Sequence, residues 1–139
     1  MNKKIKVKIE TTIYVWIKKV WEFWTLPKHI AKWNFASDDW HCPKAENDLR
    51  IGGKMSSRME AKDGSFGFDF EAIYSEIIKW KKIAYQMTDG RVAITHFKNL
   101  GGKTKVSTIF DAENENLIEM QKGGWQAILN NFKKYAESK

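Results

Sequence analysis

The chain contains one cysteine and only two prolines among its 139 residues. The single thiol, Cys42, excludes an intramolecular disulfide framework and is typical of a protein from a reducing compartment. Two prolines are too few for a proline-rich linker, so we expect a single domain over residues 1–139. No run of about 18 apolar residues occurs, which excludes a transmembrane helix.

The amino terminus lacks the apolar core of a signal peptide. Lysine alternates there with β-branched residues from Lys4 to Ile9, a pattern that indicates a strand and not a targeting sequence. Together with the lone cysteine, this pattern predicts a cytoplasmic protein that does not associate with membranes.

Arginine is scarce and occurs only at Arg50, Arg58 and Arg91. Lys and Arg together still number 24 against 17 Asp and Glu, which gives a net charge of +7. Such a balance can indicate nucleic-acid binding, but here the lysines are spread over a strand, a helix, a turn and the carboxyl terminus. We interpret the excess as a solvated lysine surface and expect no nucleic-acid partner.

Aromatic residues, by contrast, are abundant, with 7 Trp, 8 Phe and 4 Tyr. Hydrophobic residues make up 42% of the chain and charged residues 29%, which is ordinary for a globular protein and excludes a disordered one. The large aromatic volume must therefore be packed in a core or used to bind something.

Periodicity predicts the order of the elements. Alternation over 5–13 predicts a strand, and apolar residues three and four apart from Ile17 to Trp24 predict a short helix. Pro27 suits the first turn of a second short helix, and 34–43 is predicted to be a loop. Strand-like alternation then recurs in the segments 45–51, 55–61, 66–74, 83–87, 91–98 and 104–110, with hairpin signals at Asp63-Gly64, Asp89-Gly90 and Gly101-Gly102.

The segment 116–137 has helical spacing and is the one element long enough to cover a sheet. Gly123-Gly124 within it indicates either a close approach of backbone or ligand, or a kink. We therefore predict an α+β fold, in which a curved antiparallel sheet of about six to seven strands wraps around a long C-terminal helix. Two short helices follow the first strand and close one end.

This order, and several segments, resemble a known family. The segments are 15–21 (VWIKKVW), 24–33 (WTLPKHIAKW), 47–54 (NDLRIGGK), Gly102-Lys103-Thr104 and Gly124-Trp125. They are similar to the activator of Hsp90 ATPase homologue family within the helix-grip (START-like, SRPBCC) superfamily. The resemblance implies a helix-grip domain with a cavity, whose better-known cousins bind lipids, hormones or polyketides. Eukaryotic co-chaperones of that name carry a further amino-terminal domain, for which this chain has no room.

Rings and thioethers in the inward strand phase are candidate ligand contacts, because they offer large apolar area and adaptable shape. The candidate ligand-binding residues are Trp33, Phe35, Trp40, Met55, Met59, Phe66, Phe68, Phe70, Tyr85, Met87, Met120 and Trp125. The same side chains could instead interdigitate in a filled core, and the sequence leaves both arrangements open.

The segment 38–42 is the densest in chemical groups, with Asp38, Asp39, His41 and Cys42. A carboxylate near an apolar mouth could act as a base, but aspartates in such segments commonly cap turns. A metal site would need two further ligands, and a nucleophilic thiol would need an oriented base, so we expect no metal, no cofactor and an inert Cys42.

Four charged residues lie on neighbouring expected strands: Arg58, Glu60, Asp69 and Glu71. The register that buries the phenylalanine run turns them to solvent, where they pair across strands. A slip by one residue would turn them into the cavity as a polar lining.

The sequence thus favours a protein that binds a small hydrophobic or aromatic molecule between sheet and helix, with no covalent chemistry required. A chaperone-associated interaction module, implied by the resemblance, is the alternative. A cyclase- or hydrolase-type enzyme using Asp38, Asp39 or His41 is the second alternative. Exposed strand edges permit a monomer or a homodimer.

Overall fold

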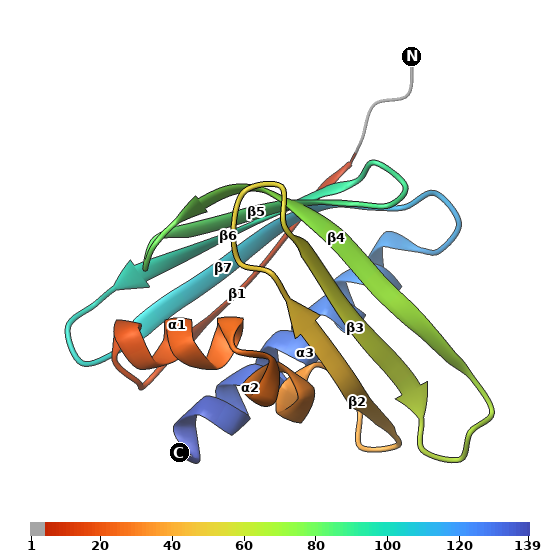
Figure 1. The fold of residues 1–139 in the computed structure, drawn as a ribbon, viewed down its shortest axis with the longest axis horizontal. Coiled ribbons are helices and arrows are strands. Elements are labelled where there is room, and N and C mark those ends of the chain that lie inside the picture. The colour runs from red at the N-terminus through yellow and green to blue at the C-terminus, as the bar shows by residue number, and fades with distance from the viewer. Residues whose placement is uncertain (1–4) are drawn as a thin grey trace.

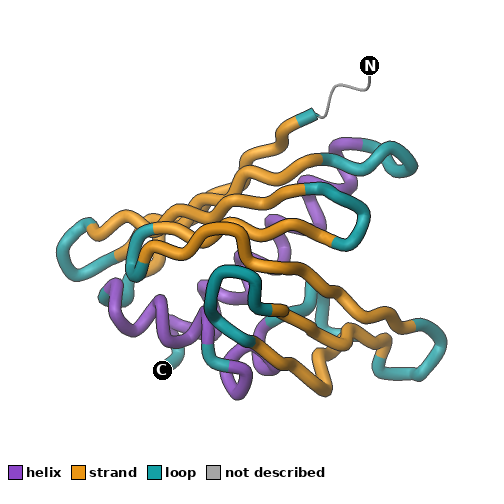
Figure 2. Tube along the Cα trace, turned by 45° about the horizontal axis from the view of Figure 1, so that its top comes forward, coloured by secondary structure: helices purple, strands orange, loops and turns teal. Residues whose placement is uncertain are grey.

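Within residues 5–139, which are the residues that the computed structural model describes, seven strands form one antiparallel sheet. The helices lie inside the curve of the sheet (Figures 1 and 2). The strands are β1 (Lys6–Ile13), β2 (Trp40–Asn47), β3 (Lys54–Ala61), β4 (Gly67–Ile78), β5 (Lys82–Met87), β6 (Val92–Asn99) and β7 (Thr104–Asp111). The helices are α1 (Ile17–Thr25), α2 (Pro27–Trp33) and α3 (Ile118–Glu137).

The strand order is β1-β7-β6-β5-β4-β3-β2, so every strand from β2 to β7 pairs with its neighbour in sequence. The first strand closes the sheet by pairing with the last. Turns at Gly64 (φ +78°) and Gly90 (φ +91°) use the positive φ that the Asp-Gly signals predict. The predicted α+β helix-grip architecture is confirmed.

The register of β3 and β4 turns the charged residues to the convex face. Arg58 lies opposite Asp69 in the ladder, and Lys54 pairs with Glu71 at 2.5 Å. The alternate positions Phe70, Ala72 and Tyr74 face inward, where Ala72 and Tyr74 are buried. The register that exposes Arg58, Glu60, Asp69 and Glu71 is therefore the one present.

Helix α3 covers the concave face, and its carboxyl-terminal half makes the deeper contacts. Leu129, Phe132 and Ala136 are buried, and Phe132 meets the stacked rings of Trp24 and Trp33 edge to face. Among residues 5–139, no helix combines the length and the apolar character needed to cross a membrane.

Some expected boundaries were wrong. The strand expected at 45–51 is β2, which begins at Trp40 and ends at Asn47. A register irregularity between His41 and Lys44 breaks the alternation there, and β2 is an edge strand, where Pro43 is tolerated. Helix α3 begins at Ile118 and not at 116. Lys4, where the amino-terminal alternation starts, lies outside the described residues.

Candidate functional site

A cavity of about 340 Å³ lies between the concave face of the sheet and the helices α2 and α3. That volume is at the lower end of the range of roughly 300–1,000 Å³ typical of small-molecule sites. Seven of the expected ligand contacts line it: Trp33, Met55, Met59, Phe68, Phe70, Tyr85 and Trp125. Rings and thioethers thus border an open space, and do not interdigitate completely.

The remaining five expected contacts lie outside the cavity lining. Phe66 precedes β4 and is 63% exposed. It lies at the end of the hairpin turn, before the part of the strand whose alternate side chains face the cavity. Trp40 packs against it, with ring centroids 6.0 Å apart. Met87 is buried in the core beyond Tyr85, Phe35 follows α2 in a loop, and Met120 is 63% exposed in the first turn of α3.

A stacked pair of rings joins β7 to α3 beside the cavity. Ala93 on β6 is fully buried and lies opposite Tyr85 of β5 and Phe110 of β7. Phe110 is covered by the Trp125 ring, which stacks on it at 4.0 Å. Of these side chains, Tyr85 and Trp125 line the cavity, whereas Ala93 and Phe110 do not.

Three hydroxyl groups give the cavity a polar part. Thr95 and Thr108 share a buried hydrogen bond of 2.7 Å between their Oγ1 atoms, and both line the cavity. Two hydroxyls in one such bond leave a second hydroxyl proton unused. The Tyr85 hydroxyl has no hydrogen-bond partner among residues 5–139, and burial raises its pKa, so the group remains a neutral donor.

Tyr74 lies next to Tyr85 in the sheet, but its hydroxyl already donates a hydrogen bond within the protein. It donates to Asn47 Oδ1 at 2.6 Å, and Asn47 Nδ2 donates to the Thr25 carbonyl at 2.6 Å. Burial raises the pKa of Tyr74 to about 12, although the bond to Asn47 opposes the shift. This chain of bonds ties β4 to the end of α1 and is structural.

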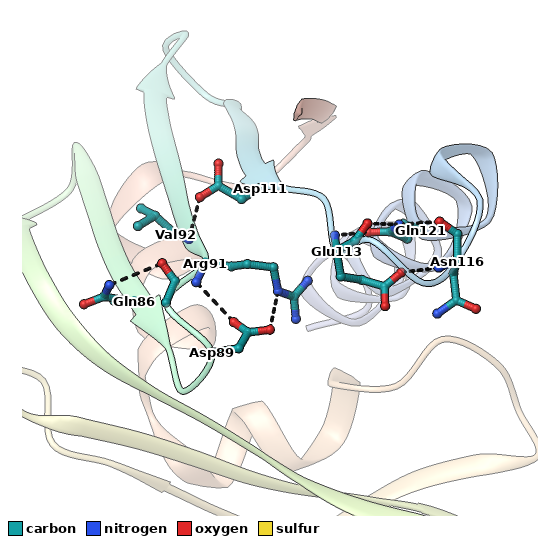
Figure 3. Close-up of polar contacts among 9 residues, drawn as sticks. Gln86, Asp89, Arg91, Val92, Asp111, Glu113, Asn116 and Gln121 are labelled. Carbon is teal, nitrogen blue, oxygen red and sulfur yellow. Dashed lines mark hydrogen bonds and ion pairs between the residues drawn. The ribbon is translucent and has the colours of Figure 1, made fainter. Parts of the chain in front are cut away.

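Charged and amide side chains gather at one end of the cavity (Figure 3). Arg91 Nε donates to Asp89 Oδ2 at 2.7 Å within the β5–β6 turn. Across the gap, Gln121 of α3 bonds the Glu113 backbone, and Glu113 Oε1 accepts from the Asn116 N–H at 2.6 Å. Figure 3 shows the Arg91 guanidinium directed toward Glu113.

The sequence reasoning missed this polar end. Arg91 could have been found from its spacing, because it shares the inward phase of Ala93 and Thr95 on the same segment. Glu113 and Gln121 carried no such signal, since Glu113 lies in the irregular loop between β7 and α3 and Gln121 lies in the first turn of α3.

The chemically dense segment 38–42 lies away from the cavity lining. Asp38 and Asp39 are exposed, and Asp39 accepts a hydrogen bond from Ser37 in a turn. His41 faces Glu60, 3.6 Å away, on the convex side. Burial raises the pKa of the Cys42 thiol, which favours the unreactive protonated form. Residues 5–139 contain no group of three His, Cys, Asp or Glu arranged to hold a metal ion.

A family model described as "Activator of Hsp90 ATPase homolog 1-like protein" matches residues 15–137. The chain belongs to this family. The match covers both short helices, β2 to β7 and α3, so it includes every element that lines the cavity except β1. The resemblance noted from the sequence is confirmed.

Two solved structures of similar sequence have the same fold. The AHSA1-like protein from Aeromonas hydrophila is 41% identical, with a TM-score of 0.91 over 96% of this chain and 93% of that one. Protein Chr148 from Cytophaga hutchinsonii is 45% identical, with a TM-score of 0.82 over 96% and 92% of the two chains.

Solved structures of much lower sequence identity share the fold alone. Protein NE0264 from Nitrosomonas europaea is 15% identical and has a TM-score of 0.83, with 99% of this chain and 97% of that one covered. No curated protein matches the chain.

Proposed function

We propose that the protein binds a small apolar or aromatic molecule in the cavity between the sheet and α3, without covalent chemistry. The observation that carries the proposal is the cavity itself, about 340 Å³ in volume and bordered by Trp24, Trp33, Phe70 and Trp125. Cores of proteins usually close such spaces, because unfilled apolar volume is destabilising. A hollow of this size is explained when a ligand fills it.

The lining suits ligands of varied shape. Met55 and Met59 are flexible and polarizable, and the indole rings present flat faces on which an aromatic ligand can stack. Phe68 both lines the cavity and is 42% exposed, which indicates that the space opens to solvent near the start of β4. A molecule from solution therefore has a route inward. The unreactive Cys42 is compatible with a reducing, cytoplasmic setting.

Titration of the full chain with 4-phenylbutan-1-ol, followed by calorimetry and by tryptophan emission, tests the proposal. The probe has an aromatic body and a neutral polar end. We expect saturable binding at one site in the wild-type protein. Ile128→Trp, which extends an α3 side chain into the cavity, should weaken binding at least tenfold. Met55→Trp blocks the same space from β3 and serves if the first variant folds poorly.

The matched control is Ile73→Trp, because Ile73 is 45% exposed on β4 and lies outside the cavity lining. This variant should bind as the wild type does. The proposal is wrong if the probe does not bind, or if all three variants bind it equally well.

A chaperone-associated role is the second candidate, and the observation that favours it is the match to the family model. Its test is whether the full chain stimulates ATP hydrolysis by an Hsp90-type chaperone or is retained by it. Absence of both effects removes this candidate and leaves the ligand proposal unaffected.

A further inference from the structure

We propose that the cavity selects molecules whose polar end is a carboxylate, with the Arg91 guanidinium as the group that binds it. This inference rests on the proposed ligand-binding function, and it names the chemical class of the ligand: an apolar or aromatic acid. It starts from an imbalance in the lining, where a single guanidinium stands at one end of a largely apolar space.

The register brings Arg91 to the concave face. The segment that continues into β6 places Ala93, Thr95 and Phe97 on the inner side, and Arg91 has the same parity. Its side chain is 23% exposed and lines the cavity. Among the described lining residues it is the only cation, and no lysine within residues 5–139 lines the cavity.

Asp89 orients the Arg91 guanidinium but bonds only one of its nitrogens. The Asp89 carboxylate accepts from Arg91 Nε at 2.7 Å and from the Arg91 backbone N–H at 3.1 Å. Burial opposes ionisation of Asp89, but these bonds hold its pKa below the ordinary value, so the pair stays ionised at neutral pH. The two terminal nitrogens of Arg91 remain available, and they can bind a carboxylate in the bidentate manner typical of arginine.

Tyr85 adds a second donor beside the first. It lies opposite Ala93 in the ladder, two residues from Arg91 on the same face, and the positive charge of Arg91 acts on its hydroxyl. Because burial keeps that hydroxyl protonated, it can donate a hydrogen bond to an anion and carries no negative charge that would repel it. The unused proton of the Thr95–Thr108 pair lies farther along the same face.

Glu113 is the acidic residue on the opposite side of the cavity. Its negative charge limits the number of negative charges that a ligand can carry. Its Oε1 already accepts from the Asn116 N–H, and Gln121 bonds hold the Glu113 backbone in place. The carboxylate is therefore held across from the Arg91 guanidinium, as Figure 3 shows, and both residues line the cavity. A ligand with one negative charge fits between the donors, whereas a ligand with two would meet Glu113.

Three probes with the same phenylbutyl body test the inference: 4-phenylbutanoate, 4-phenylbutan-1-ol and 4-phenylbutylamine. Calorimetry on the full chain at neutral pH should give the tightest binding for the acid and the weakest for the amine. Arg91→Met should weaken acid binding roughly 10- to 100-fold, as expected for loss of a charge-assisted hydrogen bond, and leave the alcohol within about threefold.

Arg50→Met is the matched control, because Arg50 Nε also pairs with an aspartate two residues earlier, Asp48, at 2.9 Å, but at an exposed site outside the cavity. It should leave the affinities of all three probes unchanged. Glu113→Gln supplies an independent variant that retains the arginine, and it should strengthen acid binding several-fold.

The outcomes separate the two proposals. If the alcohol binds and the acid binds no more tightly, or if Arg91→Met weakens both probes equally, the carboxylate inference is wrong and the ligand cavity stands. Tighter binding of the amine would likewise overturn it. If none of the three probes binds, both proposals fail.

Discussion

His29 lies on α2 and joins that helix to α3. Its Nδ1 lies 2.6 Å from the Tyr135 hydroxyl in a hydrogen bond, and its ring packs edge to face on Phe23 at 4.9 Å. Burial lowers the pKa of His29, the neighbouring Lys28 lowers it further, and Glu22 opposes them. The contact between α2 and α3 is therefore made by the neutral imidazole.

We expect this histidine to make the protein less stable in mild acid. In the unfolded chain it titrates near 6.5, and in the folded chain at a lower pH. Between the two values the unfolded state binds the extra proton, so the free energy of unfolding decreases as the pH falls through that window. Urea unfolding between about pH 7.5 and pH 5 should show this decrease, and His29→Gln should reduce its slope.

His96→Gln is the control for that measurement, because His96 is exposed on β6. An unchanged slope in His29→Gln, or an equal change in both variants, would contradict the assignment to His29.

Helix α3 continues without interruption through Gly123 and Gly124. A Cβ added at either position would meet no atom within 4 Å, so neither glycine serves a close approach of backbone. Their effect is to weaken the helix over the part that borders the cavity, since glycine is unfavourable in a helix interior.

Gly124→Ala should therefore raise the free energy of unfolding by ~1 kcal/mol, and the melting temperature by about 3 °C. Gly101→Ala is the matched control, because that site is equally open but has φ +94° in the β6–β7 turn. It should destabilise by ~1–2 kcal/mol. Thermal and urea unfolding of the two variants should thus differ in sign, and a loss of stability in Gly124→Ala would contradict the reasoning.

Elements with strong local patterns were predictable, and those shaped by irregular backbone were not. Asp63-Gly64 and Asp89-Gly90 marked the hairpins, and the run Phe68 to Tyr74 set which face is inward. The start of β2 was hidden by the irregularity near Cys42. The polar end of the cavity was hidden because Glu113 and Gln121 reach it from a loop and a helix turn, whose approach to Arg91 depends on the packing of the whole chain.

At the scale of the molecule, α3 is held unevenly. Its carboxyl-terminal half contributes the buried Leu129, Phe132 and Ala136, and Asn131 Nδ2 donates to the Trp33 carbonyl at 2.8 Å. Its amino-terminal half lies over the cavity, where Trp125 and Ile128 are only partly buried. Helix α3 is therefore packed tightly at its carboxyl-terminal end and borders open space at its amino-terminal end.

This asymmetry predicts a gradient of hydrogen exchange along α3. Segments with fewer buried contacts open at lower free energy, so amides in 121–128 should exchange faster than those in 129–136. Saturation with 4-phenylbutan-1-ol should slow exchange in 121–128 and in the strands that face it, because the ligand binds the closed state and not the open one. Exchange in 129–136 should change little, since that half is already packed against the core. Mass spectrometry of peptides from the two halves measures the difference, and equal protection along the whole helix would show that the cavity does not loosen it.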